Sequence, residues 1–298
     1  MSRAVVFGGY GTFGGRVGRE LARFGVGVTI AGRDGNRAAA FAGTLGNDCR
    51  GVAADVSRPA DCRAALTGAA VAVHCAGPFR AADTALLDAC LDAGCHYVDI
   101  ADDRAYAAKV REYGDRFAAR GLTAAYGCSS LPGISGALAL RAAAGRPDRP
   151  ERARVTLFIG NDNPKGAAAV ASLVGGLGRP IAAPQGELRG FRDREIVPLP
   201  PPFGPRPVFN FDSPDYDLLP ALVGVRSVSV KVGFELRPAT YAFAALARLP
   251  FRYGRRTACV LDLPGRLVRG VGSSGGAVMA ELLFAAGTER RAALVARQ

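Results

Sequence analysis

The chain has 298 residues, of which 49% are hydrophobic and 21% are charged. That length supplies enough apolar residues for one large or two ordinary domains, so no part needs to be disordered for lack of a core. The formal net charge is +12, and most of the excess lies in the second half of the chain, where the arginines are scattered among prolines and glycines. Because nucleic-acid-binding proteins gather basic residues into patches, we expect no nucleic-acid partner.

The sequence also bears on the compartment of the protein. The uncharged glycine- and alanine-rich stretch over residues 166–178 is too short to span a bilayer, and the N-terminus enters a strand too soon to hold a signal peptide. The seven cysteines are an odd number at irregular spacings, and the chain has two histidines. This pattern favours buried thiols over a disulfide framework or a zinc site. We therefore expect a cytoplasmic protein with no metal site and no membrane partner.

The first twenty residues are typical of a strand, a phosphate-binding loop and a helix. An apolar run, residues 4–7, breaks into the glycine-rich stretch Gly9-Tyr10-Gly11-Thr12-Phe13-Gly14 and then resumes with helical spacing. In a G-x-G-x-x-G fingerprint, the first glycine makes a tight turn, the second lets the backbone approach a pyrophosphate, and the third lets the helix pack on the strand. These six residues are predicted to bind a dinucleotide at the N-terminus of the helix.

The end of the second predicted strand, residues 26–32, bears on the choice between NAD and NADP. An acidic residue about 20 positions past the fingerprint serves the ribose hydroxyls of NAD, whereas an arginine there suits the 2′-phosphate of NADP. Arg33 stands at this position, so NADP(H) is the predicted cofactor. Two alternatives stay open: Asp34 serves the ribose of NAD while Arg33 points to solvent, or Arg33 is an ordinary surface arginine.

The alternation of strands and helices continues to residue 126 and predicts a doubly wound parallel sheet. The third strand, residues 51–56, includes Asp55, which is expected either to accept from the adenine amine or to cap the helix that begins near Ser57. The fourth strand breaks into Ala76-Gly77-Pro78, where the sheet reverses its order and ligands bind. Further elements are expected as a helix over 84–93, a strand over 96–100, a helix over 105–120 and a strand over 122–126.

Several side chains near the carboxyl ends of the fourth to sixth strands are candidates for proton transfer during hydride transfer. The candidate acids and bases are His96, Tyr97, Asp99, Asp102 and Asp103, with Ser129 and Ser130 as orienting donors, and Ser129 is also expected at the cofactor. Each has a structural alternative. Tyr97 and His96 could instead be half-buried strand residues whose polar ends are in water. Asp102 and Asp103 could instead cap the next helix.

Four motifs in order resemble the saccharopine dehydrogenase-like, NADP-binding oxidoreductases. They are the N-terminal fingerprint, Cys75-Ala76-Gly77-Pro78-Phe79, Gly94-Cys95-His96-Tyr97-Val98-Asp99, and Gly127-Cys128-Ser129-Ser130-Leu131-Pro132-Gly133-Ile134-Ser135. The resemblance continues weakly through residues 200–204, 211–216 and 272–276. Two features depart from it: His74 stands where an asparagine is common, and relatives commonly continue into a final helix that packs on the cofactor domain.

We expect two domains, an NADP-binding Rossmann domain over residues 1–135 and an α+β domain over 136–298 built on a mixed or antiparallel sheet. In the second, strands are expected over 154–159 and over 225–234, the latter with one polar face, a helix over 165–177 and an extended crossing or lid over 198–207. The resemblance implies a hairpin between 278–284 and 292–296, and it assigns substrate binding and homodimer formation to this domain.

The sequence and the resemblance together predict an NADP-dependent reductase. It would transfer hydride to a C=N, C=C or C=O bond of a small molecule, and the basic second domain suits an anionic or carrier-bound substrate. The alternative is a non-catalytic, NADP-binding sensor or regulatory protein.

Overall fold

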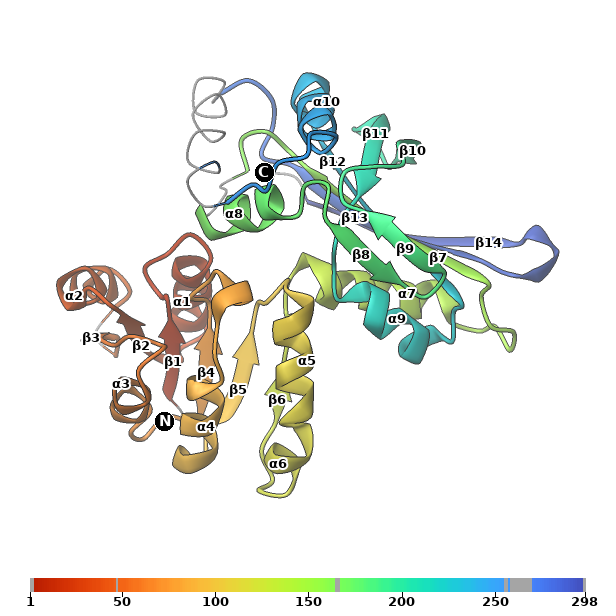
Figure 1. Ribbon diagram of the computed structural model, residues 1–298. Helices are drawn as coiled ribbons and strands as arrows, with labels where there is room; N and C mark the ends of the chain where they lie inside the picture. The colour runs from red at the N-terminus through yellow and green to blue at the C-terminus, as the bar shows by residue number, and fades with distance from the viewer. Residues whose placement is uncertain (1–2, 47, 164–166, 255–256, 258–269, 297–298) are drawn as a thin grey trace. The chain divides into compact units, whose positions relative to one another are not determined.

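The computed structural model describes residues 3–46, 48–163, 167–254, 257 and 270–296 (Figure 1). The chain divides into two compact units, Met1–Cys128 and Ser129–Gln298. The architecture is α/β, with a parallel sheet in the first unit and a mixed sheet in the second. This is the fold class that the sequence predicts.

The first unit alternates strands with helices along the chain. Its elements are β1 (Arg3–Phe7), α1 (Gly14–Arg23), β2 (Gly27–Gly32), α2 (Gly35–Gly43), β3 (Arg50–Ala53), α3 (Pro59–Ala65), β4 (Val71–His74), the helical turn η1 (Phe79–Ala81), α4 (Ala85–Ala93), β5 (His96–Asp99), α5 (Arg104–Glu112), α6 (Gly114–Ala118) and β6 (Ala124–Ala125).

All six strands of the first unit are parallel, in the order β3-β2-β1-β4-β5-β6. After β3 the chain returns to the other side of β1, so the order reverses between β1 and β4. Helices α1 and α2 pack on one face, around Val28 and Ile30. Helices α3 to α6 pack on the other face, around Phe7 and Tyr97. Because both faces are covered, the inner strands read as continuous apolar runs, and this made them recognisable in the sequence.

The second unit is built from longer strands and fewer helices. Its elements are η2 (Ser130–Ile134), α7 (Ser135–Ala143), β7 (Arg152–Ile159), α8 (Ala167–Gly175), β8 (Pro180–Ala183), β9 (Gly186–Arg189), β10 (Glu195–Leu199), β11 (Gly204–Asn210), α9 (Asp215–Val223), β12 (Ser227–Phe234), α10 (Arg237–Leu246), β13 (Gly276–Leu283), η3 (Ala285–Gly287) and β14 (Glu289–Ala296).

The main sheet of the second unit has the order β10-β11-β12-β7-β13-β14, and β8 and β9 form a separate pair. Strands β12 and β7 run parallel, whereas the other neighbours are antiparallel. Helices α7 and α9 pack on one face of this sheet through apolar residues such as Ala139 and Leu219. The opposite face carries an apolar cluster around Phe158 and Met279.

Three expectations for individual elements are refined by the structure. The expected helix over 105–120 is divided into α5 and α6 at Tyr113, next to Gly114, a residue with low helix propensity. The strand β12 does alternate, with Ser227 and Ser229 half-buried on its polar face, but Lys231 on that face is 2% exposed and forms an ion pair of 2.8 Å with Glu195. The expected helix over 165–177 is α8, which begins at Ala167; Lys165 lies outside the described residues.

Strands β13 and β14 form the hairpin that the resemblance implied. The expected extended crossing or lid over 198–207 is instead a second hairpin: β10 and β11 pair in antiparallel register, and residues 200–203 between them form a turn. The described helices include none that is long and apolar enough to cross a membrane. The six cysteines in the described part of the chain have free thiols, and Cys259 lies outside it.

Candidate cofactor site

The loop between β1 and α1 is packed so closely that its glycines admit no side chains. Gly8 has a φ of +73°, a backbone conformation that favours glycine. A Cβ on Gly9 would lie 2.7 Å from the carbonyl oxygen of Val6, and a Cβ on Gly14 would collide with the carbonyl oxygen of Gly8. The loop therefore presents backbone where the dinucleotide fingerprint requires a close approach to phosphate.

The N-terminus of α1 differs from those of α2 and α5. Phe13 stands at its N-cap, no side chain caps it, and its first turn has no acidic residue. By contrast, Asp34 accepts from the amide of Arg37 at the start of α2, and Asp103 accepts from the amide of Tyr106 at the start of α5. The amides of Gly15 and Arg16 already donate to the carbonyls of Gly11 and Phe13, at 2.9 and 3.0 Å, so what the start of α1 offers to phosphate is the positive end of the helix dipole, with no side chain in the way. The loop and the start of α1 therefore fit a dinucleotide.

The loop that follows β4 lies against the glycine loop. A Cβ on Gly8 would lie 2.9 Å from the Cα atom of Ala76. Beyond Ala76, Gly77 and Pro78 are exposed. The structure therefore brings the predicted cofactor residues Ala76, Gly77 and Pro78 beside the fingerprint, at the point where the strand order reverses.

Two neighbouring residues at the end of β2, Arg33 and Asp34, have different surroundings. Arg33 is exposed. Asp34 directs one carboxylate oxygen, Oδ1, to the amide of Arg37 at 3.0 Å, so it serves as the cap of α2. The amide of Asp34 itself donates to the hydroxyl of Tyr10 at 3.1 Å. This arrangement commits the acid to α2, whereas the exposed Arg33 interacts electrostatically with the Asp55 carboxylate after β3.

Asp55 is half-buried and organises a turn. Its Oδ1 accepts from the amide and the hydroxyl of Ser57, at 3.1 and 2.8 Å. These two hydrogen bonds are the main reason that the pKa of the Asp55 carboxyl is lowered. Helix α3 has Arg58 at its N-cap and no side-chain cap. The expectation that Asp55 caps this helix is therefore wrong, because its acceptor is used by Ser57 in the preceding turn.

Two of the predicted catalytic residues lie in a buried polar cluster, which we define as His74, Tyr97, Asp99 and Tyr106. The Tyr97 hydroxyl donates to Asp99 Oδ2 at 3.0 Å and lies 2.8 Å from the Tyr106 hydroxyl. The Nδ1 atom of His74 is 3.1 Å from each of these hydroxyls. Tyr97 and Asp99 are both 0% exposed, so the expectation that the polar end of Tyr97 is in water is wrong: it lies in the dry core between the sheet and α5.

Burial shifts the titration of every member of this cluster. It lowers the pKa of His74 from 6.5 to about 4, so the imidazole is neutral at pH 7. It raises the pKa of Tyr97 and of Tyr106. It also raises the pKa of Asp99, although the amides of Gly127 and Ala101 donate to its Oδ1 and act in the opposite direction.

The remaining candidates lie apart from the buried polar cluster. His96 is exposed at the start of β5, and its Nδ1 accepts from the amide of Thr123 at 3.0 Å. Asp102 is half-buried in the loop after β5, and burial raises the pKa of its carboxyl. Asp103, besides capping α5, lies 3.5 Å from Arg80. Ser129 belongs to the second unit, where its hydroxyl donates to the carbonyl of Leu131 at 2.7 Å.

Sequence reasoning singled out His74 only as a departure from a family pattern, and it missed Tyr106. The apolar spacing of Tyr106, Ala107 and Val110 on α5 indicates a buried face. It does not indicate which polar groups the tyrosine hydroxyl meets, because those groups come from β4 and β5.

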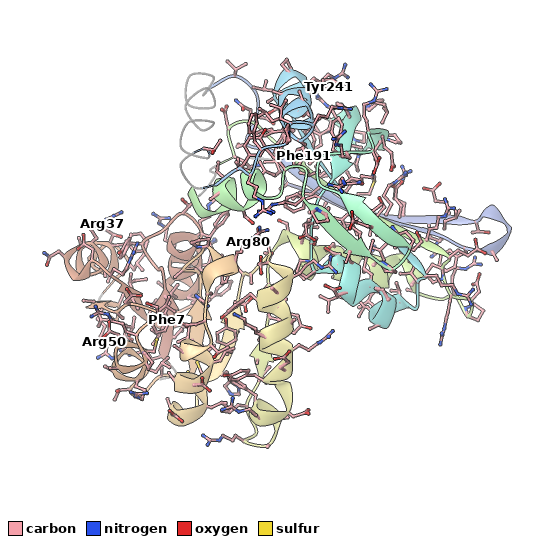
Figure 2. All side chains as sticks on the ribbon, viewed as in Figure 1. Phe7, Arg37, Arg50, Arg80, Phe191 and Tyr241 are labelled. Atoms are coloured by element: carbon pink, nitrogen blue, oxygen red, sulfur yellow. The ribbon has the colours of Figure 1, made fainter. Side chains whose placement is uncertain are left out.

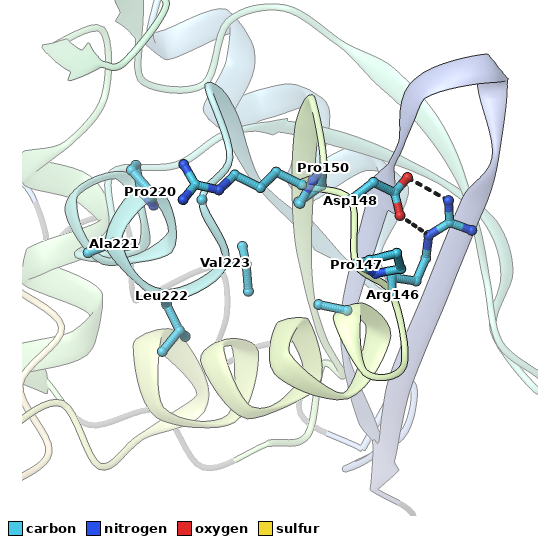
Figure 3. Close-up of a pocket in the computed structure, with 11 residues that line it drawn as sticks. Arg146, Pro147, Asp148, Pro150, Pro220, Ala221, Leu222 and Val223 are labelled. Carbon is cyan, nitrogen blue, oxygen red and sulfur yellow. Dashed lines mark hydrogen bonds and ion pairs between the residues drawn. The ribbon is translucent and has the colours of Figure 1, made fainter.

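The second unit has a separate pocket of about 370 Å³ between the C-terminal ends of α7 and α9 (Figure 3). At its rim Arg146 and Asp148 form a two-pronged ion pair, with distances of 2.7 and 2.5 Å. None of the site residues predicted from the sequence lines this pocket.

Comparison with known proteins gives a family for the first unit. Residues 4–125 match the saccharopine dehydrogenase NADP binding domain family. No curated protein sequence matches the chain.

Solved structures give the fold. Apo saccharopine dehydrogenase (L-Glu forming) from Saccharomyces cerevisiae has a TM-score of 0.64 at 12% identity, over 99% of this chain and 85% of that one. A short-chain type dehydrogenase/reductase from Mycobacterium ulcerans has a TM-score of 0.36 at 18% identity, over 42% of this chain and 66% of that one. The RhlG/NADP active-site complex from Pseudomonas aeruginosa has a TM-score of 0.36 at 19% identity, over 42% of this chain and 69% of that one.

The family match covers the glycine loop, the end of β2 and the buried polar cluster, and the yeast enzyme shares the fold of nearly the whole chain. The first unit therefore matches the saccharopine dehydrogenase NADP binding domain family, and the chain as a whole shares the fold of the yeast enzyme.

Proposed function

We propose that the protein is an NADP-dependent reductase that transfers hydride to a C=N, C=C or C=O bond of a small metabolite. The observation that carries the proposal is the glycine loop, whose packing excludes side chains, followed by a helix that no side chain caps. The exposed Arg33 at the end of β2 supports the choice of NADP, because Asp34 beside it caps α2.

In this proposal the residues near the end of β5 have two different roles, proton transfer and positioning. Bound NADPH supplies the hydride, and the protein supplies a proton and orients the substrate. Asp102 is the proposed proton donor, since it is half-buried and its raised pKa favours the protonated carboxyl. Tyr97 and Asp99 are fully buried and act as positioning residues: Asp99 fixes the turns after β5 and β6 through the amides of Ala101 and Gly127. His96 stands at the opposite end of β5 from Asp99.

The second unit is proposed to bind the substrate and to form a homodimer in the cytoplasm. Most of the positive charge of the chain lies in this half, and it suits a carboxylate or an acidic carrier on the substrate. Ser129, the first residue of the second compact unit, is proposed to contact the cofactor, and the boundary between the two functional domains is proposed after residue 135.

One observation favours the alternative, a sensor that binds NADP without turnover. Tyr97 and Asp99, which the sequence placed among the catalytic candidates, are both 0% exposed. A sensor needs the cofactor loop and a surface that changes on binding, but it needs no proton donor.

A titration of the purified chain with NADPH and NADH, followed by fluorescence and thermal unfolding, tests the proposal. A ligand that binds the native state raises the melting temperature. We expect NADPH to bind more tightly than NADH; binding of neither would overturn the proposed function. If NADPH binds, turnover of imines, enones and ketones separates the reductase from the sensor. Asp102→Asn should then abolish turnover while NADPH binding is retained.

A further inference from the structure

The side chain of Arg37 is held on the glycine loop by an aromatic ring. Its guanidinium carbon lies 4.7 Å from the centroid of the Tyr10 ring. Arg37 is in the first turn of α2 and is exposed (Figure 2). Within the described part of the chain, no carboxylate forms an ion pair with it. The guanidinium therefore keeps its hydrogen-bonding edge free while one of its faces covers the ring.

Tyr10 is itself fixed in place. Its ring packs on Gly32, the last residue of β2, so closely that a Cβ on Gly32 would collide with it. Its hydroxyl accepts from the amide of Asp34 at 3.1 Å. The ring thus joins the fingerprint loop to the end of β2 and determines where Arg37 lies.

The acid in this region does not compete for the same ligand. Asp34 Oδ1 accepts from the amide of Arg37 at 3.0 Å, which ties the carboxylate to the start of α2. Arg33 and Arg37 are both exposed on the segment that follows β2. The N-terminus of α2 is already occupied by the Asp34 carboxylate, so the two guanidinium groups themselves favour a dianion over a pair of neutral hydroxyls.

We propose that Arg37 is a second specificity-determining residue for NADP, which binds the 2′-phosphate together with Arg33, and that Tyr10 is its platform. This inference rests on the proposed function, because it requires NADP in the glycine loop. A guanidinium stacked on a ring is already ordered, so it loses little freedom when its N–H groups bind phosphate oxygens. A lysine in its place has no planar face to rest on Tyr10 and offers a point charge instead of a fork of donors.

The test measures dissociation constants of NADPH, NADH, adenosine 2′,5′-bisphosphate and 5′-AMP for the full chain and its variants. Arg37→Ala should weaken NADPH and the bisphosphate by about 10- to 100-fold, the range expected for one charge-assisted contact. NADH and 5′-AMP should change by less than about 3-fold, since the lost contact is to the 2′-phosphate. Arg37→Lys should fall between the wild type and Arg37→Ala, and Tyr10→Leu should weaken NADPH more than NADH.

Arg19→Ala is the matched control. Arg19 is also an exposed arginine over an aromatic ring of the first unit, 5.0 Å from the centroid of Phe41, but it lies on α1. Its replacement should leave all four constants within about 2-fold of the wild type, because no contact to the ligand is lost.

The outcomes separate this inference from the proposed function. A wild-type chain that binds neither NADPH nor NADH overturns the proposed function, and the inference falls with it. A wild-type chain that prefers NADPH, with Arg37→Ala keeping the same preference, overturns the inference alone. Equal losses of affinity for NADPH and for NADH in Arg37→Ala, each relative to the wild type, also overturn the inference. They would assign Arg37 to the adenine rather than to the 2′-phosphate.

Discussion

The two units bury polar side chains in different ways. In the first unit, the buried polar cluster joins two tyrosine hydroxyls, a neutral imidazole and one carboxylate. In the main sheet of the second, charged groups are buried as ion pairs: the Glu281 side chain is 3% exposed and lies 2.6 Å from both Arg154 and Arg291, while Lys231 meets Glu195. Outside that sheet, Asp215 on α9 is buried against the hydroxyls of Ser135 and Ser213. The first arrangement consists mainly of neutral hydrogen bonds, and the second depends on opposite charges.

This difference has a physical consequence for stability. Removal of one partner from a buried ion pair leaves a charge without compensation, which costs more than the loss of a neutral hydrogen bond. The stability of the second unit's sheet should therefore depend more on substitutions that remove a charge than on pH. The stability of the first unit should depend more on pH than on such substitutions. Three substitutions test this comparison.

The largest effect is expected from Glu281→Gln on β13. The change leaves Arg154 and Arg291 without their shared carboxylate. We expect a loss of about 3 kcal/mol in the free energy of unfolding, at the low end for a broken buried pair because both arginines are partly exposed. Urea unfolding of the full chain and of the variant checks the value.

Glu289→Gln is the control for this substitution. Glu289 also pairs with Arg291, at 3.5 Å, but its side chain is half-exposed. Exposed pairs contribute about 0–1 kcal/mol, so this variant should be close to the wild type. Equal losses for the two variants would mean that the burial of Glu281 does not set the strength of its ion pairs.

An intermediate effect is expected from pH through His74. Its pKa is lowered from 6.5 to about 4 in the folded state, so between these values the unfolded chain binds more protons. Stability from this group is complete above pH 6.5 and is lost as the pH falls toward 4, by up to about 3 kcal/mol. Asp99, whose pKa burial raises, acts in the opposite direction at lower pH. The difference between the wild type and His74→Gln isolates the histidine.

The measurement is the free energy of unfolding of the first unit at several pH values from 7.5 to 4.5, a range that covers most of the His74 window. The wild type should lose stability over this range, and His74→Gln should have a flatter profile, whatever its stability at pH 7.5. Parallel profiles would show that His74 is not buried as a neutral imidazole.

The sequence predicts those parts of the molecule whose signals are local. The glycine loop, the parallel strands and the β13–β14 hairpin follow from apolar runs interrupted by glycine, or from a family pattern. The capping role of Asp34 depends only on the amide of Arg37, three residues away, but an acid at the end of a strand also suits a ribose, and that was the role considered for Asp34 from the sequence.

What the sequence could not predict depends on partners from distant strands. A lysine in a strand indicates a solvated face, yet Lys231 is buried because Glu195 on β10 reaches it across the sheet. Tyr97 suggested a half-exposed ring, yet its hydroxyl meets groups from β4 and α5. A polar residue in a strand predicts solvent only when no partner is available, and that condition is set by topology.

The smallest effect is expected from Tyr106→Phe, which removes one hydroxyl from the buried polar cluster. The Tyr97 hydroxyl and His74 Nδ1 remain 3.1 Å apart, and Tyr97 keeps its bond to Asp99, so each retains a partner. The loss should therefore be about 1 kcal/mol, typical of one neutral hydrogen bond. Tyr113→Phe is the control, because its hydroxyl donates to Asp88 in a part-buried position of the same unit and its loss should cost less. A loss from Tyr106→Phe as large as that from Glu281→Gln would contradict the distinction between the two units, since it would mean that the neutral network is as sensitive as the ion pairs.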